Sequence, residues 1–196
     1  MTVPAEIPTS RLPAGFRYEP SVFDGSTSEA HLAALLTEVD WEQHQFRIYG
    51  RAVAMPRLIA MYGPAAYRYS GIEHPPCPLP PRVAAIRDRV EGSTGRRFNA
   101  VLLNLYRDGR DSDSWHRDDD YEHGAHADIA SVSFGAVRRF HMRDGAGNTA
   151  SLDLEPGSVL LMQGEALKRW WHCLPKTKRP VGARVNLTFR DIAVPS

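Results

Sequence analysis

Apolar residues recur at helical spacing in two segments of the first half of the chain, after Ser28 and after Pro80–Pro81. The first segment predicts a helix of about three turns with Ser28 as its N-cap. The second predicts a helix that starts at the two prolines and stops at Gly92. The apolar positions are Leu32, Leu35, Leu36 and Val39 in the first helix and Val83, Ile86 and Val90 in the second.

After residue 97 the pattern changes to short runs rich in β-branched and aromatic residues, separated by Gly, Pro or Asp, which is typical of strands. Gly145–Ala150 is interpreted as a hairpin turn, because a dinucleotide-binding fingerprint would need a helix after it. One more short strand is expected near Phe16–Tyr18. The main predicted strands are Phe98–Tyr106, Ile129–Phe134, Arg139–Met142, Ser151–Leu154, Ser158–Met162, Trp170–Leu174 and Arg184–Arg190.

Two helices followed by many short strands predict an α+β fold, in which N-terminal helices buttress a double-stranded β-helix, or jelly roll. The length of 196 residues favours a single domain. The two cysteines, Cys77 and Cys173, are far apart, so a disulfide framework and a thiolate zinc site are both excluded. There is no signal-peptide pattern and no long apolar run, so we expect a soluble, cytoplasmic protein without a membrane partner, and a monomer.

The formal net charge of +1 excludes a uniformly basic nucleic-acid module, but it hides two opposed segments. Asp108–Asp128 holds eight acidic and two basic residues, whereas Lys168–Arg190 holds seven basic residues and no acidic one. Five of these seven are candidates for contacts with phosphates, which would give a modest and salt-dependent affinity for nucleic acid. They are Lys168, Arg169, Lys176, Lys178 and Arg179.

The acidic segment contains His116-x-Asp118, which places an imidazole and a carboxylate on the same side of an extended chain. A distant histidine would complete a facial triad of two histidines and one carboxylate, which holds Fe(II) and leaves positions open for a co-substrate and O₂. His172 is the best third ligand, because it lies in a strand-like run. Arg184 and Arg190 follow it at even spacing and could anchor an acidic co-substrate.

These residues belong to an ordered set of motifs that resembles the AlkB family of Fe(II)- and 2-oxoglutarate-dependent dioxygenases. The resemblance runs from about Pro56 to Ile192. Its motifs are Pro56-Arg57, Tyr67-Arg-Tyr69-Ser70-Gly71, Asn104-x-Tyr106, His116-x-Asp118-x-Asp120, Ser131-Val-Ser-Phe-Gly135, Trp171-His172-x-x-Pro175 and Arg184-x-Asn186-x-Thr188-x-Arg190.

The resemblance implies that His116, Asp118 and His172 bind Fe(II), and that 2-oxoglutarate and O₂ are co-substrates. It implies that Arg184 binds the distal carboxylate of 2-oxoglutarate, helped by Tyr106 and Asn186. Arg190 and Asn104 would hold the carboxylate end near the metal.

The resemblance also implies a substrate, an alkylated base flipped out of its stack. Asp120 would accept a hydrogen bond from the exocyclic amine of the base, Tyr69 would stack on it, and Tyr67 and Ser70 would line a lid over it. His116 could form the opposite wall. The expected organisation is an irregular leader (1–28), helices with a nucleotide-recognition lid (29–97) and a jelly-roll catalytic core (98–196).

The implied activity is oxidative demethylation of bases of the 1-methyladenine and 3-methylcytosine type, in DNA or RNA, with release of formaldehyde, succinate and CO₂. The segment Trp41–Gly50, where the duplex-specific family member carries an apolar finger, has no apolar tip, which favours single-stranded substrates over duplex. Two alternatives stay open: an oxygenase acting on a protein or small molecule, and a non-catalytic sensor of 2-oxoglutarate or metal.

Overall fold

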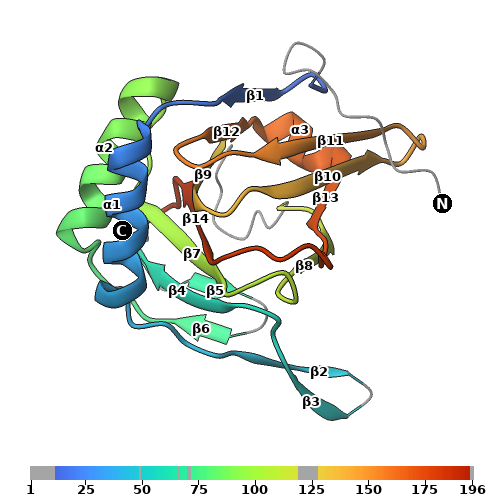
Figure 1. Ribbon diagram of the computed structural model, residues 1–196, viewed down its shortest axis with the longest axis horizontal. Helices are drawn as coiled ribbons and strands as arrows, with labels where there is room; N and C mark the ends of the chain where they lie inside the picture. Colours follow the sequence, from blue (N-terminus) through green and yellow to red (C-terminus); the bar gives the residue numbers. More distant parts are fainter. Residues whose placement is uncertain (1–11, 49, 66, 70–71, 119–127, 195–196) are drawn as a thin grey trace.

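The computed structural model describes residues 12–48, 50–65, 67–69, 72–118 and 128–194, which form two antiparallel β-sheets that face each other (Figure 1). The larger sheet contains, in order, β1 (Phe16–Glu19), β12 (Val159–Met162), β9 (Ile129–Gly135), β14 (Arg184–Arg190), β7 (Ala100–Tyr106) and β4 (Leu58–Tyr62). The smaller contains β11 (Thr149–Leu154), β10 (Arg138–Asp144), β13 (Trp170–Leu174) and β8 (Asp113–His116). Two facing antiparallel sheets are what a jelly roll requires.

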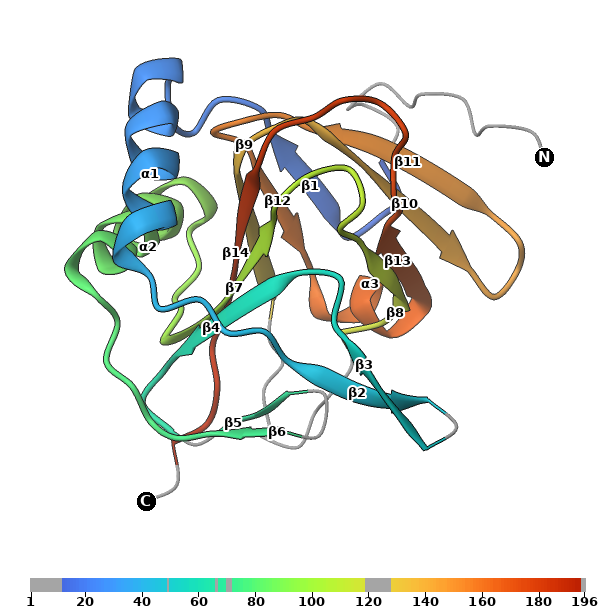
Figure 2. The ribbon, with the colours of Figure 1, turned by 60° about the horizontal axis from the view of Figure 1, so that its bottom comes forward.

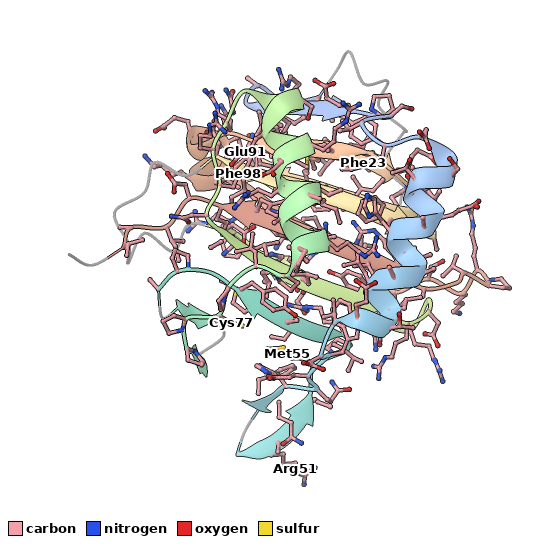
Figure 3. The ribbon with its side chains drawn as sticks, turned by 90° about the vertical axis from the view of Figure 1, so that its left-hand side faces the viewer. Phe23, Arg51, Met55, Cys77, Glu91 and Phe98 are labelled. Carbon is pink, nitrogen blue, oxygen red and sulfur yellow. The ribbon has the colours of Figure 1, made fainter. Side chains whose placement is uncertain are left out.

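Helices α1 (Gly25–Glu38) and α2 (Pro81–Thr94) lie side by side across the outer face of the larger sheet, as Figure 3 shows. Their buried apolar residues share one core cluster with the strand residues beneath them. A second cluster fills the space between the two sheets, and the short helix α3 (Gly164–Arg169) contributes to it. The larger sheet is therefore covered on both faces.

Both predicted helices exist, but their ends differ from the prediction. The N-cap of α1 is Asp24, whose carboxylate accepts the backbone N–H of Thr27 at 2.7 Å, so the helix starts before Ser28 and buries that serine. The C-cap of α2 is Gly95 rather than Gly92, because Gly95 adopts the left-handed conformation (φ 69°). A glycine ends a helix only where the chain takes up that conformation.

All the main strands that were predicted are present within a few residues of their expected limits. Of the two edge strands of the larger sheet, β1 was predicted and β4 was not. β1 extends the expected short strand near residue 16 and pairs with β12, so the range expected as a leader supplies an edge of the larger sheet. β4 supplies the opposite edge by pairing with β7. Gly147, with φ 86°, lies in the hairpin turn between β10 and β11, as predicted.

Two hairpins lie outside the facing sheets and were not predicted: β2 (Gln45–Ile48) with β3 (Arg51–Ala54), and β5 (Tyr67–Tyr69) with β6 (Ile72–His74). The β2–β3 hairpin projects away from the body of the molecule (Figure 2), with Arg51 near its tip (Figure 3). No helix among the described residues is long and apolar enough to span a bilayer.

Candidate active site

Three predicted metal ligands meet at one end of the space between the sheets. His116, Asp118 and His172 each offer one ligand atom, and these atoms lie within 4.8 Å of one another. The Nε2 atoms of His116 and His172 lie 3.8 and 3.6 Å from the two carboxylate oxygens of Asp118. These separations are too long for hydrogen bonds, but they suit three donors that converge on one ion. Two imidazoles and one carboxylate fit Fe(II).

The pairing of β8 with β13 creates this convergence. His116 and His172 are direct partners across the two strands, and their rings lie 4.2 Å apart, centroid to centroid. Directly opposite residues in antiparallel strands project to the same face of a sheet. Here that face looks inward, toward the larger sheet. Asp118 follows two residues after His116, just beyond the end of β8.

The ring of His116 is oriented by the backbone of its own strand. Its Nδ1 lies 2.7 Å from the carbonyl oxygen of Ser114, which can only accept a hydrogen bond. Nδ1 therefore carries the proton, and the lone pair of Nε2 is left to point at the site.

Burial and neighbouring charges keep His172 and Asp118 in the protonation states that metal binding needs. Burial lowers the pKa of His172 to about 4, although Asp118 opposes the shift, so its imidazole is neutral near pH 7. Burial alone would raise the pKa of Asp118, but the charge of Arg190, and at acidic pH the charges of the protonated histidines, outweigh it and lower the pKa to about 2. Arg190 donates to Asp118 at 3.1 Å, a contact that was not expected from the sequence.

Arg184 lies deep in the same pocket, on β14. It is 2% exposed, donates to the hydroxyl of Ser133 at 2.9 Å, and has its guanidinium carbon 5.3 Å from the centre of the Tyr106 ring. Its Nε atom is buried without a hydrogen-bond partner, and no carboxylate of the described residues pairs with it. Burial lowers its pKa to about 10, so the group remains charged at neutral pH. A buried cation in this position needs an anion, and a carboxylate of 2-oxoglutarate would supply it.

The other predicted co-substrate residues also line this pocket, since Tyr106, Asn104 and Asn186 face it from neighbouring strands. Asn186 donates at 2.8 Å to both the Ser131 hydroxyl and the Val132 carbonyl. The serines of β9 belong to a motif of the resemblance, but no role in the pocket was predicted for them. Their alternation in Ser131-Val-Ser133 would have revealed it, because alternate residues of a strand share a face.

The predicted substrate residues are described only in part. The backbones of Tyr67 and Tyr69 form β5, while their side chains, together with Ser70 and Asp120, lie outside the described residues. Cys173 is buried, and burial raises the pKa of its thiol to about 11, as suits an inert residue. Trp171 is exposed, because it alternates with the ligand His172 along β13 and its side chain lies on the opposite face.

Comparison with known proteins settles the family. The model of the 2OG-Fe(II) oxygenase superfamily matches residues 15–190. The chain belongs to this superfamily. Its resemblance to the AlkB family is confirmed by relatives of that name, and the family accounts for Fe(II), 2-oxoglutarate and O₂ as the cofactor and co-substrates of this oxygenase.

The oxygenase is 43% identical over 157 residues to human "DNA oxidative demethylase ALKBH2", covering 74% of this chain and 60% of that protein. It is 36% identical over 184 residues to human "Alpha-ketoglutarate-dependent dioxygenase alkB homolog 3", covering 88% and 64%. The chain thus spans about three fifths of the length of these relatives. The solved structure titled "The structure of OsALKBH1" superposes with a TM-score of 0.67 at 15% identity, covering 92% of this chain and 99% of that one, which shows a shared fold.

Proposed function

We propose that this oxygenase removes methyl groups from N-alkylated bases in DNA or RNA, of the 1-methyladenine and 3-methylcytosine type, with release of formaldehyde, succinate and CO₂. The observation that carries the proposal is the buried Arg184, which faces the three converging ligands without a carboxylate partner among the described residues. Relatives named as DNA demethylases support the choice of nucleic acid as the substrate.

In this proposal His116, Asp118 and His172 hold Fe(II), which together with 2-oxoglutarate and O₂ supplies the oxidation of the N-linked methyl carbon. Arg184 binds the distal carboxylate of 2-oxoglutarate through two parallel N–H groups of its guanidinium, with Tyr106 beside it.

The remaining co-substrate contacts follow from the same pocket. Asn186 lies next to Arg184 along the pocket face of β14, and Asn104 lies opposite it on β7. Asn104 and Arg190 would hold the carboxylate end of 2-oxoglutarate that lies nearest the metal. Arg190 already donates a hydrogen bond to Asp118, so it would link the carboxylate that binds the metal to the co-substrate.

The base is held by residues of the proposed lid. Tyr69 stacks on the flipped base, Tyr67 and Ser70 line the lid, and Asp120 accepts a hydrogen bond from the exocyclic amine. Flipping a base costs a few kcal/mol, and stacking on one aromatic ring returns about 1–3 kcal/mol. An alkylated pairing edge already weakens pairing, so damaged bases are the easiest to extract.

We propose single-stranded nucleic acid as the preferred substrate and a monomer as the active form. In the projecting hairpin, the apolar residues Phe46 of β2 and Val53 of β3 are cross-strand partners, and the β3 residue nearest the tip is the charged Arg51. Phosphate contacts would come from the loop before β14, where Lys176, Lys178 and Arg179 are exposed. Lys168 and Arg169, by contrast, already pair with Glu165 and Asp144.

The test is turnover of methylated oligonucleotides. The protein is incubated with Fe(II), 2-oxoglutarate, ascorbate and single-stranded DNA, RNA or duplex DNA that carries 1-methyladenine or 3-methylcytosine, and the methyl group is followed by mass spectrometry. We expect loss of the methyl group, fastest on a single strand, and no loss with His116→Ala. Succinate formed without demethylation of any oligonucleotide would contradict the proposed substrate. Absence of both products would instead favour a sensor.

The neighbouring aspartates offer a matched pair of variants. Asp120→Ala should slow demethylation far more than it slows the uncoupled conversion of 2-oxoglutarate, because it removes a contact to the base only. Asp119→Ala, the same change one residue away, should have little effect on either. Equal loss of both reactions in Asp120→Ala would contradict a role in reading the base.

A further inference from the structure

Arg57 lies immediately before β4, in the Pro56-Arg57 motif, to which the proposed reaction gives no role. It is 5% exposed, which is unusual for an arginine. Its backbone is held in place by Gln43, whose side-chain amide donates to the carbonyls of Met55 at 2.7 Å and of Arg57 at 3.3 Å. Because the backbone of Arg57 is fixed and its side chain is buried, its guanidinium is confined to one position.

The guanidinium of Arg57 bridges two segments of the active site. Its Nε donates to the Oδ1 atom of Asn104 at 2.8 Å, and its Nη1 forms an ion pair with the carboxylate of Asp113 at 2.9 Å. The same Nη1 lies 3.4 Å from the carbonyl oxygen of Ser112. Asn104 is a predicted co-substrate residue, and Asp113 begins the strand that carries His116.

We propose that Arg57 is a positioning residue, which turns the amide of Asn104 so that its NH₂ group faces 2-oxoglutarate and which holds Asp113 away from the metal ligand His116. This inference rests on the proposed function, because it assumes that Asn104 meets a carboxylate of 2-oxoglutarate.

The orientation of Asn104 follows from the chemistry of its partner. A guanidinium has only N–H groups to offer, so the atom of Asn104 that it contacts must be the oxygen. The NH₂ group is then the end left for the pocket that Asn104 lines. A carboxylate accepts hydrogen bonds from such a group, whereas the amide oxygen would repel it. Arg57 therefore selects the one amide orientation that can bind the co-substrate.

The ion pair between Arg57 and Asp113 acts on the metal side of the pocket. Asp113 Oδ1 lies 3.9 Å from His116 Nδ1, whose hydrogen bond goes to the Ser114 carbonyl at 2.7 Å. An unpaired carboxylate at that distance would compete for the Nδ1 proton and rotate the ring. Because Asp113 is paired with Arg57, the ring keeps the orientation that directs Nε2 to the metal site.

A lysine in place of Arg57 would keep the charge but lose the planar fork, so it could not hold Asn104 and Asp113 together. Arg57→Lys should therefore weaken 2-oxoglutarate binding while the protein stays folded. Arg89→Lys is the matched control, since Arg89 donates through its Nε to the Val22 carbonyl, away from the pocket.

The experiment measures 2-oxoglutarate binding to the Mn(II)-loaded protein by isothermal titration calorimetry. We expect Arg57→Lys to raise the dissociation constant roughly 10- to 100-fold, the range for loss of a partner that orients a metal site, and Arg89→Lys to leave it unchanged. Asn104→Ala should weaken binding as well, and Arg57→Lys should add nothing in the Asn104→Ala background. No effect of Arg57→Lys, or an effect that adds fully to that of Asn104→Ala, would overturn the proposal.

Thermal unfolding shows whether Arg57→Lys is folded. If it is not, Asn104→Asp still tests whether the NH₂ group of Asn104 binds 2-oxoglutarate. This substitution keeps the shape of the side chain and the contact with Arg57 but removes the NH₂ donors. Binding as weak as in Asn104→Ala supports the proposal, and binding equal to the unsubstituted protein overturns it. If the unsubstituted protein itself fails to bind 2-oxoglutarate, the proposed function fails.

Discussion

The two faces of β14 are both buried, yet one is apolar and packs in the core while the other is polar and lines the pocket. Val185, Leu187 and Phe189 point toward the helices and are fully buried in the apolar cluster there. The residues that alternate with them line the pocket between the sheets. They are Arg184, Asn186, Thr188 and Arg190. One strand thus joins the part of the core that stabilises the fold to the part that binds ligands.

The difference lies in how each face is satisfied. The apolar face needs only close packing. On the polar face, the side chains of Asn186 and Thr188 find hydrogen-bond partners within the protein. Thr188 donates to the Asn186 amide oxygen at 3.1 Å, and Asn186 donates to Ser131 and Val132 of β9. Arg184 differs from Asn186 and Thr188, because its Nε has no hydrogen-bond partner among the described residues and no carboxylate of those residues pairs with it. A buried guanidinium that is left partly unsatisfied calls for an explanation, and an anionic ligand in the same pocket would supply one.

The largest expected effect comes from the apolar face. Phe189→Ala should lower the free energy of unfolding by about 3–5 kcal/mol, because it removes a fully buried ring and leaves a cavity. Urea unfolding followed by circular dichroism would measure the loss. The fraction that stays folded should bind 2-oxoglutarate normally. Weaker binding without lower stability would show that the two faces are not separate.

The opposite result is expected from the polar face. Arg184→Leu should weaken 2-oxoglutarate binding at least about 30-fold, or about 2 kcal/mol, the lower end of the cost of removing one partner of a buried charge pair. Stability should hold or rise, because a buried charge is replaced by an apolar side chain. Calorimetric titration and urea unfolding test the two parts. A loss of stability as large as that of Phe189→Ala would make Arg184 a structural residue.

The smallest effect should come from within the polar face. Thr188→Val keeps the shape of the side chain but removes its hydrogen bond to Asn186, which should cost about 1 kcal/mol of stability. The dissociation constant for 2-oxoglutarate should change less than tenfold, because Arg184 is untouched. Thermal unfolding and calorimetric titration measure the two quantities. A larger loss of binding than in Arg184→Leu would place the main anchor at Asn186 and Thr188.

Strands were predictable where burial and composition agreed. β7, β9 and β14 are rich in apolar residues and buried along nearly their whole length, and all three were predicted. β8 was missed, because Asp-Ser-Trp-His is a polar, partly exposed edge strand without a strand-like pattern. The β2–β3 hairpin was missed for a similar reason, since all of β3 is exposed. Such strands are defined by their pairing partners, which are not visible in local sequence.

Helix ends show the same limit. Ser28 and Gly92 are reasonable caps by residue type, yet Asp24 and Gly95 act as the caps. Several nearby residues could serve each role. The choice between them depends on which turn can still pack against the sheet, and this is a tertiary property.

The residue types proposed for the site could be predicted from the sequence, because donor types and the two-residue period of strands are local properties. His116-x-Asp118 together with the strand-like run around His172 predicted three ligands, and the even spacing of Arg184 and Arg190 predicted two cationic anchors. The fold, in contrast, makes His116 and His172 direct partners and brings Arg57 to both Asn104 and Asp113. Register between distant strands and the direction of a buried side chain depend on packing of the whole domain, which no local pattern encodes.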